Sequence, residues 1–307
     1  MDIFLQQLIN GLVLGSVYAL VALGYTMVYG ILGLINFAHG EIAMVGAMVA
    51  LAAIGALANS ALPGGVVLAA GLLLAIPVCM GLGMLIERVA YRPLRNAPRL
   101  APLITAIGVS IILQNGAMLI WGKQYIAFPA VLPQGRYNLF GAHISDVQIA
   151  ILVVSALLLL LLSLLVHQTR LGRAMRATAQ SRQVASLMGV DVNRVIAATF
   201  VIGSALAAVA GLMVSAYYGL AHYYMGFMLG LKAFSAAVLG GIGHLGGAML
   251  GGLLLGLIES FGAGYIGDLT GGFLGSHYQD VFAFFVLIGV LVLRPSGLLG
   301  ARMTERA

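Results

Sequence analysis

The sequence contains very little charge and almost no cysteine. Only 8% of its 307 residues are Asp, Glu, Lys or Arg, whereas 62% are hydrophobic and the mean hydropathy is +1.07. This composition excludes a soluble globular domain of this length, which would need far more polar surface. The single cysteine, Cys79, excludes a disulfide within the chain. Its apolar surroundings predict a buried, unreactive thiol.

The sequence also lacks the motifs of nucleotide hydrolysis and of metal binding. It contains no Gly-x-x-x-x-Gly-Lys-Ser/Thr phosphate loop, and no group of residues resembles a metal site. We therefore expect no catalytic residues, no metal ligands and no cofactor bound by this chain. Any ATP hydrolysis that it depends on must be supplied by partner subunits.

The net charge of +6 does not indicate nucleic-acid binding, because most of the 15 basic residues flank apolar runs. Three clusters hold them: Arg88, Arg92, Arg95 and Arg99; Arg170, Arg173, Arg176, Arg182 and Arg194; and Arg294, Arg302 and Arg306. By the positive-inside rule these clusters lie in the cytoplasm, where they can also contact anionic lipid headgroups.

Long apolar runs predict an all-α polytopic membrane protein with about eight to nine membrane-spanning helices. The expected spans are residues 3–28, 41–58, 65–86, 103–121, 149–166, 195–217, 226–243, 248–265 and 281–293. They form one transmembrane domain over residues 1–307. Alternation across the membrane places the N-terminus outside, a loop at about 122–145 outside, and the C-terminus in the cytoplasm. Gly11 and Gly15 form a Gly-x-x-x-Gly pattern that favours close helix packing.

Polar residues interrupt the spans at three places. Asn36, His39 and Glu41 break an otherwise apolar stretch, and Lys232 and Glu259 stand alone in later runs. Ionisable groups at membrane depth are costly and usually face a cavity, a partner or water. We expect residues 30–47 and 226–243 to be broken or re-entrant segments and these five residues to line the translocation path or its gate. The alternatives are a solvated turn for the first group and simple ion pairing for the second.

The longest basic interruption, at about 168–194, has helical character. Strong helix formers cover most of it, and Gly189 ends the second helical piece, because glycine readily adopts the left-handed conformation. Val184, Leu187 and Met188 share one helix face, which predicts an apolar ridge in the cytoplasm. The residues expected to couple to a partner are Arg173, Arg176, Ala177, Val184, Ala185, Leu187, Met188 and Gly189. The alternative is a solvated basic loop.

Several stretches of the chain resemble a known transporter family. The spacing of Arg, Ala, Gly and Val residues over 176–190 is similar to the coupling loop of ABC-importer permeases. Residues 15–47, 86–115 and 226–243 resemble high-affinity branched-chain amino acid permeases of the LivH type. Together these stretches cover most of the chain. The resemblance implies the ABC-importer permease fold.

The resemblance also implies a function and a set of partners. The function is the transmembrane permease subunit of an ATP-driven importer of leucine, isoleucine and valine in the bacterial inner membrane. The implied partners are a homologous second permease subunit, two cytoplasmic ATPases that bind ATP and Mg²⁺, an extracytoplasmic amino-acid-binding protein and membrane lipid. The chain itself would be a transporter subunit and not an enzyme.

Three other functions remain open from the sequence. A permease of the same family could carry urea, amides or other amino acids. An ion-coupled secondary transporter could use His39, Glu41, Lys232 or Glu259, and a channel or structural membrane subunit would need no ATP. ATP-dependent uptake by the copurified assembly distinguishes these possibilities.

Overall fold

The computed structural model describes residues 2–58, 62–95, 97–98, 100–129, 131, 135–139, 141–269, 271 and 278–300. Arg99, Arg302 and Arg306 of the basic clusters lie outside the described residues. The single-domain prediction over 1–307 is not tested by this description.

Helices dominate the described part of the chain. In chain order the elements are α1 (Asp2–Leu32), α2 (His39–Leu57), α3 (Gly64–Ile86), a π-helical turn η1 (Glu87–Tyr91), α4 (Leu100–Trp121), β1 (Ile126–Ala127), β2 (Arg136–Leu139), β3 (Ala142–Ser145), α5 (Asp146–Gln168), α6 (Arg170–Gln180), α7 (Arg182–Leu187), α8 (Val192–Tyr218), β4 (Leu220–Ala221), α9 (Met225–Gly240), α10 (Leu245–Leu269) and α11 (Gln279–Leu293).

The predicted all-α membrane architecture is confirmed. Within the described residues, seven helices are long and apolar enough to cross a membrane: α1, α2, α3 with its π-helical turn, α4, α5, α8 and α10. α9 and α11 are shorter apolar helices. The additional feature is a set of short strands, in which β1 pairs with β4 and β2 with β3, both antiparallel.

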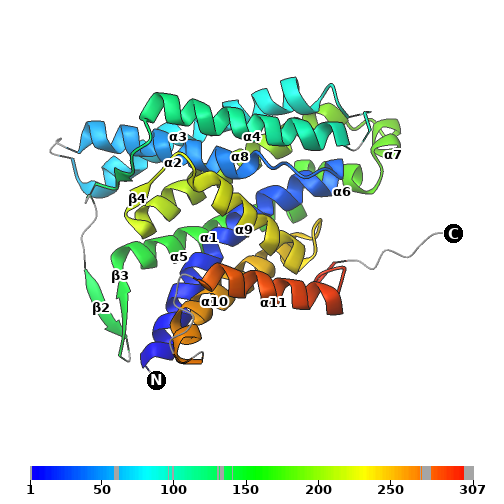
Figure 1. Ribbon diagram of the computed structural model, residues 1–307. Helices are drawn as coiled ribbons and strands as arrows, with labels where there is room; N and C mark the ends of the chain where they lie inside the picture. The colour runs from blue at the N-terminus through cyan, green and yellow to red at the C-terminus, as the bar shows by residue number, and fades with distance from the viewer. Residues whose placement is uncertain are drawn as a thin grey trace.

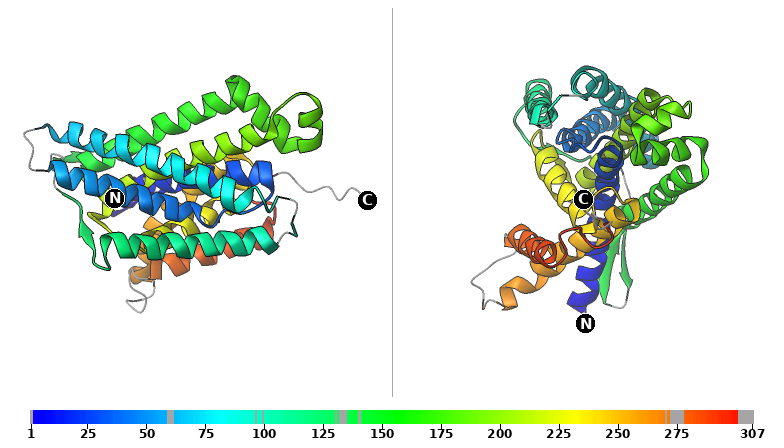
Figure 2. Two further views of the ribbon diagram at one scale, coloured as in Figure 1. Left: turned by 90° about the horizontal axis from the view of Figure 1, so that it is seen from above. Right: turned by 90° about the vertical axis from the view of Figure 1, so that its right-hand side faces the viewer.

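The helices run roughly side by side, so the molecule has two distinct ends (Figures 1 and 2). The four strands lie at one end, whereas α6, α7 and the end of α11 lie at the other (Figure 1). The segment after α11 is held at that same end, because the backbone N–H groups of Leu298 and Leu299 donate to the Leu239 and Gly240 carbonyls of α9. The two loops predicted to face opposite sides of the membrane are therefore at opposite ends of the bundle.

Helix α1 forms the centre of the bundle, and its glycines allow α10 to approach closely. A Cβ atom placed on Gly11 or Gly15 would lie 2.8 Å from the Cα atom of Leu257 or Leu253. Gly256 faces Gly15 in return. The Gly-x-x-x-Gly pattern of α1 is thus a packing surface between two spans, as small-residue motifs are in lipid, where close van der Waals contact drives association.

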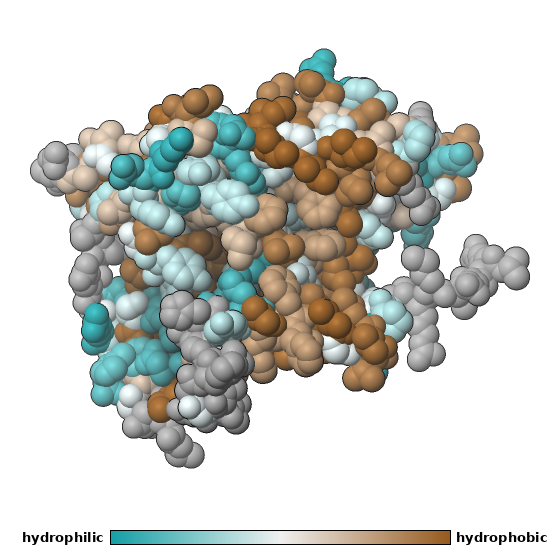
Figure 3. Space-filling model, viewed as in Figure 1, coloured by the Kyte–Doolittle hydropathy of each residue, from teal (hydrophilic) through white to brown (hydrophobic). Residues whose placement is uncertain are grey.

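Helices α3, α4 and α5 surround this centre and expose apolar side chains. Leu73 of α3, Ile112 of α4 and Leu160 of α5 are 72%, 69% and 57% exposed. Apolar residues also cover much of the face that carries α4 and α11 (Figure 3). A soluble protein would hide such a surface, whereas a membrane protein presents it to lipid or to a partner subunit in the membrane.

The structure breaks one of the two segments that we expected to be broken. α1 ends at Leu32 and α2 begins at His39, and the residues between them are not helical although Asn36 and Ala38 are buried. Non-helical backbone at membrane depth requires such protein surroundings. In contrast, residues 226–243 begin with a continuous helix, α9, which is followed by a turn.

Candidate functional site

The carboxylate of Glu41 is held by α4. It is 1% exposed, and its Oε1 atom accepts hydrogen bonds from Gln114 Nε2 at 2.6 Å and Ser110 Oγ at 3.1 Å. Its Oε2 atom is buried without a hydrogen-bond partner among the described residues and lies beside Gly226 of α9. A buried carboxylate with one free oxygen is a group that can accept a donor when the helices separate.

His39 lies between α1 and α8. Its ring is 2% exposed, packs against the backbone of Gly24 and stands edge-on to Tyr25, with ring centroids 5.0 Å apart. Gly203 of α8 lies on the same side as Gly24. Because both facing positions are glycines, the imidazole fits into the space that side chains would otherwise occupy.

Asn36 lies in the non-helical segment before α2. Its Oδ1 atom accepts a hydrogen bond of 3.0 Å from the Tyr91 hydroxyl, and the Tyr91 ring packs on Phe200 of α8. The Asn36 Nδ2 atom is buried with no partner among the residues described. Asn36, His39 and Glu41 therefore contact different helices and are not solvated, which removes the alternative of a solvated turn.

Lys232 and Glu259 form an ion pair, which is the alternative that the sequence left open for them. Lys232 Nζ lies 2.6 Å from Glu259 Oε1 and 2.8 Å from Asp280 Oδ1 of α11. The Tyr18 hydroxyl of α1 donates to Glu259 Oε2 at 2.9 Å. This polar group joins α1, α9, α10 and α11 in an apolar region. Its composition matches the alternative of pairing.

The five predicted path residues separate into two groups on opposite faces of α9. Gly226 and Gly230 of α9 pack against Gly40 at the start of α2, next to Glu41. Lys232 follows Gly230 by two residues, which is a rotation of about 200° around the helix axis. Its side chain therefore points to α10 and α11, away from Glu41. α9 is thus the element that lies between both polar groups.

Sequence reasoning missed four partners of these residues. Tyr18, Tyr91, Ser110 and Asp280 each complete a polar contact, but each stands in its own element without a local signal. Gln114 could have been suspected, because an amide in the apolar α4 run needs a partner at membrane depth.

The segment predicted to be cytoplasmic folds into α6 and α7, and hydrogen bonds connect it to two spans. Arg176 of α6 donates to the Val166 carbonyl near the end of α5, and Arg182 of α7 donates to the carbonyl of Leu32, the last residue of α1, at 2.8 Å. Arginine side chains at helix C-termini satisfy carbonyls that lack partners and suit the helix dipole. These two hydrogen bonds therefore attach α6 to α5 and α7 to α1.

The predicted apolar ridge is present, but Ala185 does not belong to it. Val184, Leu187 and Met188 are 58%, 86% and 79% exposed, whereas Ala185 is 3% exposed. The expectation that Ala185 contacts a partner directly is wrong, because Ala185 lies on the face of α7 that packs against the chain itself. Gly189 ends the helix with φ +82°, as predicted. Arg173 is exposed and Ala177 half-buried.

A third contact links the loop before α4 to α8. Arg95 pairs with Glu87, and its Nη1 atom donates to Asn193 Oδ1 at 2.5 Å. Burial lowers the pKa of the Arg95 guanidinium, while the Glu87 carboxylate opposes this shift. The N-terminus of α8 is thereby fixed to the loop after α3.

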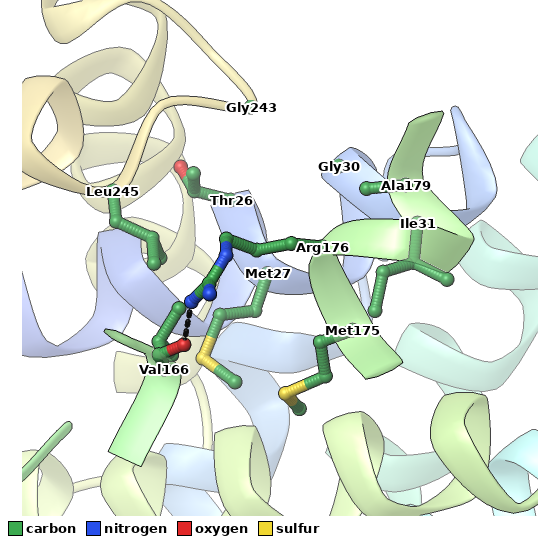
Figure 4. A pocket seen from close by; sticks show the side chains of 10 residues that line it. All are labelled: Thr26, Met27, Gly30, Ile31, Val166, Met175, Arg176, Ala179, Gly243 and Leu245. Carbon is green, nitrogen blue, oxygen red and sulfur yellow. Dashed lines mark hydrogen bonds between the residues drawn. The ribbon is translucent and has the colours of Figure 1, made fainter. Parts of the chain in front are cut away.

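Two adjoining pockets open beside α6, between the end of α1 and the turn from α9 to α10. The larger has a volume of about 620 Å³ and includes Tyr29, Arg182 and His244 in its lining. The smaller has a volume of about 90 Å³. Figure 4 shows its lining, with the Arg176 side chain across the middle and the bond to the Val166 carbonyl marked.

Within the described residues, no three His, Cys, Asp or Glu side chains are arranged so that they could hold a metal ion. Cys79 is a buried free thiol that donates to the Ile42 carbonyl at 3.4 Å.

Comparison with known proteins relates the chain to transport proteins. Residues 7–291 match the family model described as "Branched-chain amino acid transport system / permease component". The chain is 50% identical to the high-affinity branched-chain amino acid transport system permease protein BraD of Pseudomonas aeruginosa, over 99% of this chain and 98% of that protein.

Two further relatives show the range of this similarity. The chain is 47% identical to the permease protein LivH of the same type of system in Escherichia coli K12, over 99% of this chain and 97% of LivH. It is 32% identical to the autoinducer 2 import system permease protein LsrC of Salmonella paratyphi B, over 62% of this chain and 54% of LsrC.

Proposed function

Because the chain belongs to the permease family of branched-chain amino acid transport systems, we propose that it is the membrane subunit of an ATP-driven importer of leucine, isoleucine and valine. The observation that carries this proposal is identity of 50% and 47%, over nearly the whole chain, to two high-affinity branched-chain amino acid permeases. Partial similarity alone would not distinguish the cargo, since LsrC belongs to a different import system.

The proposal includes partners and a location. A homologous second permease subunit completes the pore, two cytoplasmic ATPases hold the ATP and Mg²⁺, and an extracytoplasmic binding protein delivers the amino acid. The chain is a multi-pass protein of the bacterial inner membrane, with the end that carries α6, α7 and residues 294–300 in the cytoplasm. The chain acts as a transport subunit and breaks no bond.

The contacts of α6 and α7 support a coupling role. The ridge of Val184, Leu187 and Met188 offers an apolar docking surface to an ATPase, and such a surface is costly to expose to water. Arg176 and Arg182 connect these helices to α5 and α1. ATP binding drives transport only if the ATPases bind the inward-open and outward-open conformers with different free energies.

The buried polar group near the start of α2 supports a gating role. Glu41 joins α2 to α4 through Ser110 and Gln114, and His39 occupies the gap between Gly24 and Gly203. These contacts close the space between helices in this conformation. Opening a path requires them to separate, and the free Glu41 oxygen then faces the opening.

Uptake by the reconstituted assembly tests the proposal. The transporter is purified through a tag on this chain, placed in lipid vesicles with ATP inside, and given binding protein loaded with radiolabelled leucine, isoleucine or valine. We expect accumulation that requires ATP and binding protein. Vesicles without ATP are the control.

The alternatives predict different results in the same experiment. Accumulation of urea, amides or other amino acids in preference to leucine would assign another cargo within the family. Accumulation without ATP, driven by a proton or sodium gradient, would identify a secondary transporter and overturn the proposal.

A further inference from the structure

The proposed transport cycle gives the smaller pocket no ligand, yet the residues that line it could distinguish one class of ligand from another. α1, α5, α6 and the turn from α9 to α10 meet there (Figure 4). Its lining consists of Thr26, Met27, Gly30, Ile31, Val166, Met175, Arg176, Ala179, Gly243 and Leu245. One cation and one hydroxyl thus stand among apolar side chains and glycines, and none of these residues is acidic.

Thr26 supplies a polar atom that lacks a partner. Its side chain is 1% exposed, and its Oγ1 atom makes no hydrogen bond to any described residue. A threonine inside a helix usually bonds to a carbonyl of the preceding turn, as Thr178 and Thr199 do in this chain. A buried hydroxyl without a partner is unfavourable, so this atom is suited to a bond with a bound group.

Arg176 supplies the charge. Its Nη1 atom donates to the Val166 carbonyl, which leaves other N–H groups of the guanidinium available. In Figure 4 the Arg176 side chain passes between Thr26 and Met27. The remaining lining residues with side chains of any length, Ile31, Met175 and Leu245, are apolar.

The size of the pocket limits the ligand to a short molecule. Its volume is about 90 Å³, and a single buried water needs roughly 10–15 Å³ on the same measure. A group of several heavy atoms therefore fits, whereas the acyl chains of a phospholipid do not. An ammonium group would lie near Arg176 without an acidic side chain to pair with.

We propose that this pocket binds a short branched aliphatic carboxylate without an ammonium group, held by Arg176 and Thr26, with its chain against Met27, Met175 and Leu245. This chemistry is that of the α-keto acids that remain when branched-chain amino acids lose their amino group. The link to the cargo rests on the proposed function, whereas the binding site itself does not.

Because the pocket lies between α6 and α1, a bound ligand would affect transport. A carboxylate bonded to both Arg176 and Thr26 connects α6, which lies in the coupling segment, to α1. A ligand that favours one arrangement of α6 and α1 stabilises one conformer at the expense of the other. The bound acid therefore slows ATP-driven uptake from the cytoplasmic side and does not compete with the external amino acid.

Calorimetric titration of the purified transporter, without binding protein, tests the site directly. The probes are α-ketoisocaproate and isocaproate, with isocaproamide as the neutral isostere and leucine as the zwitterion. We expect saturable binding of both acids and none of the amide, because the amide has no charge to pair with Arg176. Leucine binds at least about tenfold more weakly than α-ketoisocaproate, since its ammonium group is unpaired.

Four variants separate the site from general effects on the fold. Thr26→Val removes the hydroxyl at nearly constant shape and weakens acid binding about tenfold, while Thr26→Ser restores it. Arg176→Gln abolishes binding. Arg170→Gln, an exposed position on the same helix outside the pocket, leaves binding unchanged.

Three results would overturn this assignment. These are equal binding of acid and amide, unchanged binding by Thr26→Val and Arg176→Gln, and binding that appears only with anionic phospholipid in the micelle, which would make the site a lipid headgroup contact. The titration measures binding and not uptake, so its result can still be interpreted if the proposed transport function is wrong. A vesicle assay with α-ketoisocaproate inside then measures the expected decrease in uptake.

Discussion

At the scale of single residues, the polar side chains within the bundle depend on glycines that face them. The His39 ring lies so close to Gly24 that a Cβ atom at this position would collide with it. Gly24→Ala should therefore displace the ring and lower stability by about 1–3 kcal/mol, the usual cost of overpacking. The thermal unfolding of the purified protein measures this change.

Two companion variants make the Gly24 prediction specific. Gly108→Ala in α4 is the matched control, because a Cβ atom there meets nothing within 4 Å. Combining Gly24→Ala with His39→Ala should recover part of the lost stability, since the smaller side chain removes the collision. Equal stability of Gly24→Ala and Gly108→Ala would show that the ring does not occupy this position.

Glu41 provides the second prediction at this scale. Glu41→Ala leaves the Ser110 hydroxyl and the Gln114 amide without their shared acceptor, and each buried unsatisfied group costs about 1–3 kcal/mol. We expect uptake to fall about tenfold or more while the assembly stays intact. Glu41→Gln keeps an acceptor oxygen and should lose less.

The control for Glu41 is Asn115→Ala in α4. Asn115 is exposed, and among the described residues its amide bonds only to the Ile111 carbonyl of its own helix. Uptake should remain near the parental value in this variant. Parental uptake by Glu41→Ala would mean that the carboxylate is structural and does not belong to the path.

Buried polar residues could be located from the sequence, but their partners could not. Asn36, His39 and Glu41 stand out because polar groups in apolar runs are costly. Their partners depend on how α2, α3 and α4 pack. Tyr91 donates a hydrogen bond to Asn36, and Ser110 donates one to Glu41. No local pattern encodes such contacts between distant positions.

At the scale of whole elements, α9 connects two polar groups through its opposite faces. Its Lys232 pairs with Glu259 of α10 and Asp280 of α11. Lys232→Ala leaves Glu259 as an unpaired buried charge, and breaking a buried pair in this way costs about 3–5 kcal/mol. We expect this variant to lose its monodisperse elution profile after heating at a temperature that the parent survives.

Neutralising both partners distinguishes pairing from a direct role in transport. Lys232→Met with Glu259→Gln should be more stable than Lys232→Ala alone, because the fully buried Glu259 charge is removed as well, and Asp280, the carboxylate that remains, is 30% exposed. Lys123→Ala changes the other lysine of the chain, which is exposed, and should have little effect. If the double variant is less stable than the single one, the pair is not the source of the effect.

The extents of the spans could be predicted because lipid imposes them. The runs at 65–86 and 149–166 correspond to α3 and α5 within a few residues. The four short strands could not be predicted, since segments as brief as Ile126–Ala127 pair only when distant loops meet. Burial of Ala185 was also missed, because helical spacing identifies the face of α7 but not which side another helix covers.

At the scale of the whole molecule, the basic residues of α6 and α7 and the strands lie at opposite ends (Figure 1). This arrangement predicts how the chain is oriented in the membrane. Asn138 in β2 and Gln180 in α6 are both exposed and lie at opposite ends of the bundle. A membrane-impermeant thiol reagent added outside intact cells should label Asn138→Cys and not Gln180→Cys. The native Cys79 is buried and gives little background. The reverse labelling pattern would contradict the predicted topology.

The proposed coupling to ATPase subunits can be tested at the ridge on α7. Leu187 is 86% exposed, so Leu187→Asp changes no contact within the bundle and adds no charge to a span. Ala185→Asp would not test docking, because Ala185 is buried in the chain itself. Arg182→Glu is equally unsuitable as a control, since Arg182 donates to the Leu32 carbonyl.

An unpaired aspartate forced into an apolar interface typically costs about 1–3 kcal/mol or more, which weakens docking by about fivefold or more. We therefore expect Leu187→Asp to insert into the membrane at parental levels but to lose its copurifying ATPase subunits and its uptake. Arg170→Asp places the same side chain at another exposed position of the segment, outside the ridge, and should retain both. Parental uptake by Leu187→Asp would show that force reaches α1 and α5 by another surface, and the hydrogen bonds of Arg176 and Arg182 would then serve only to cap helix ends.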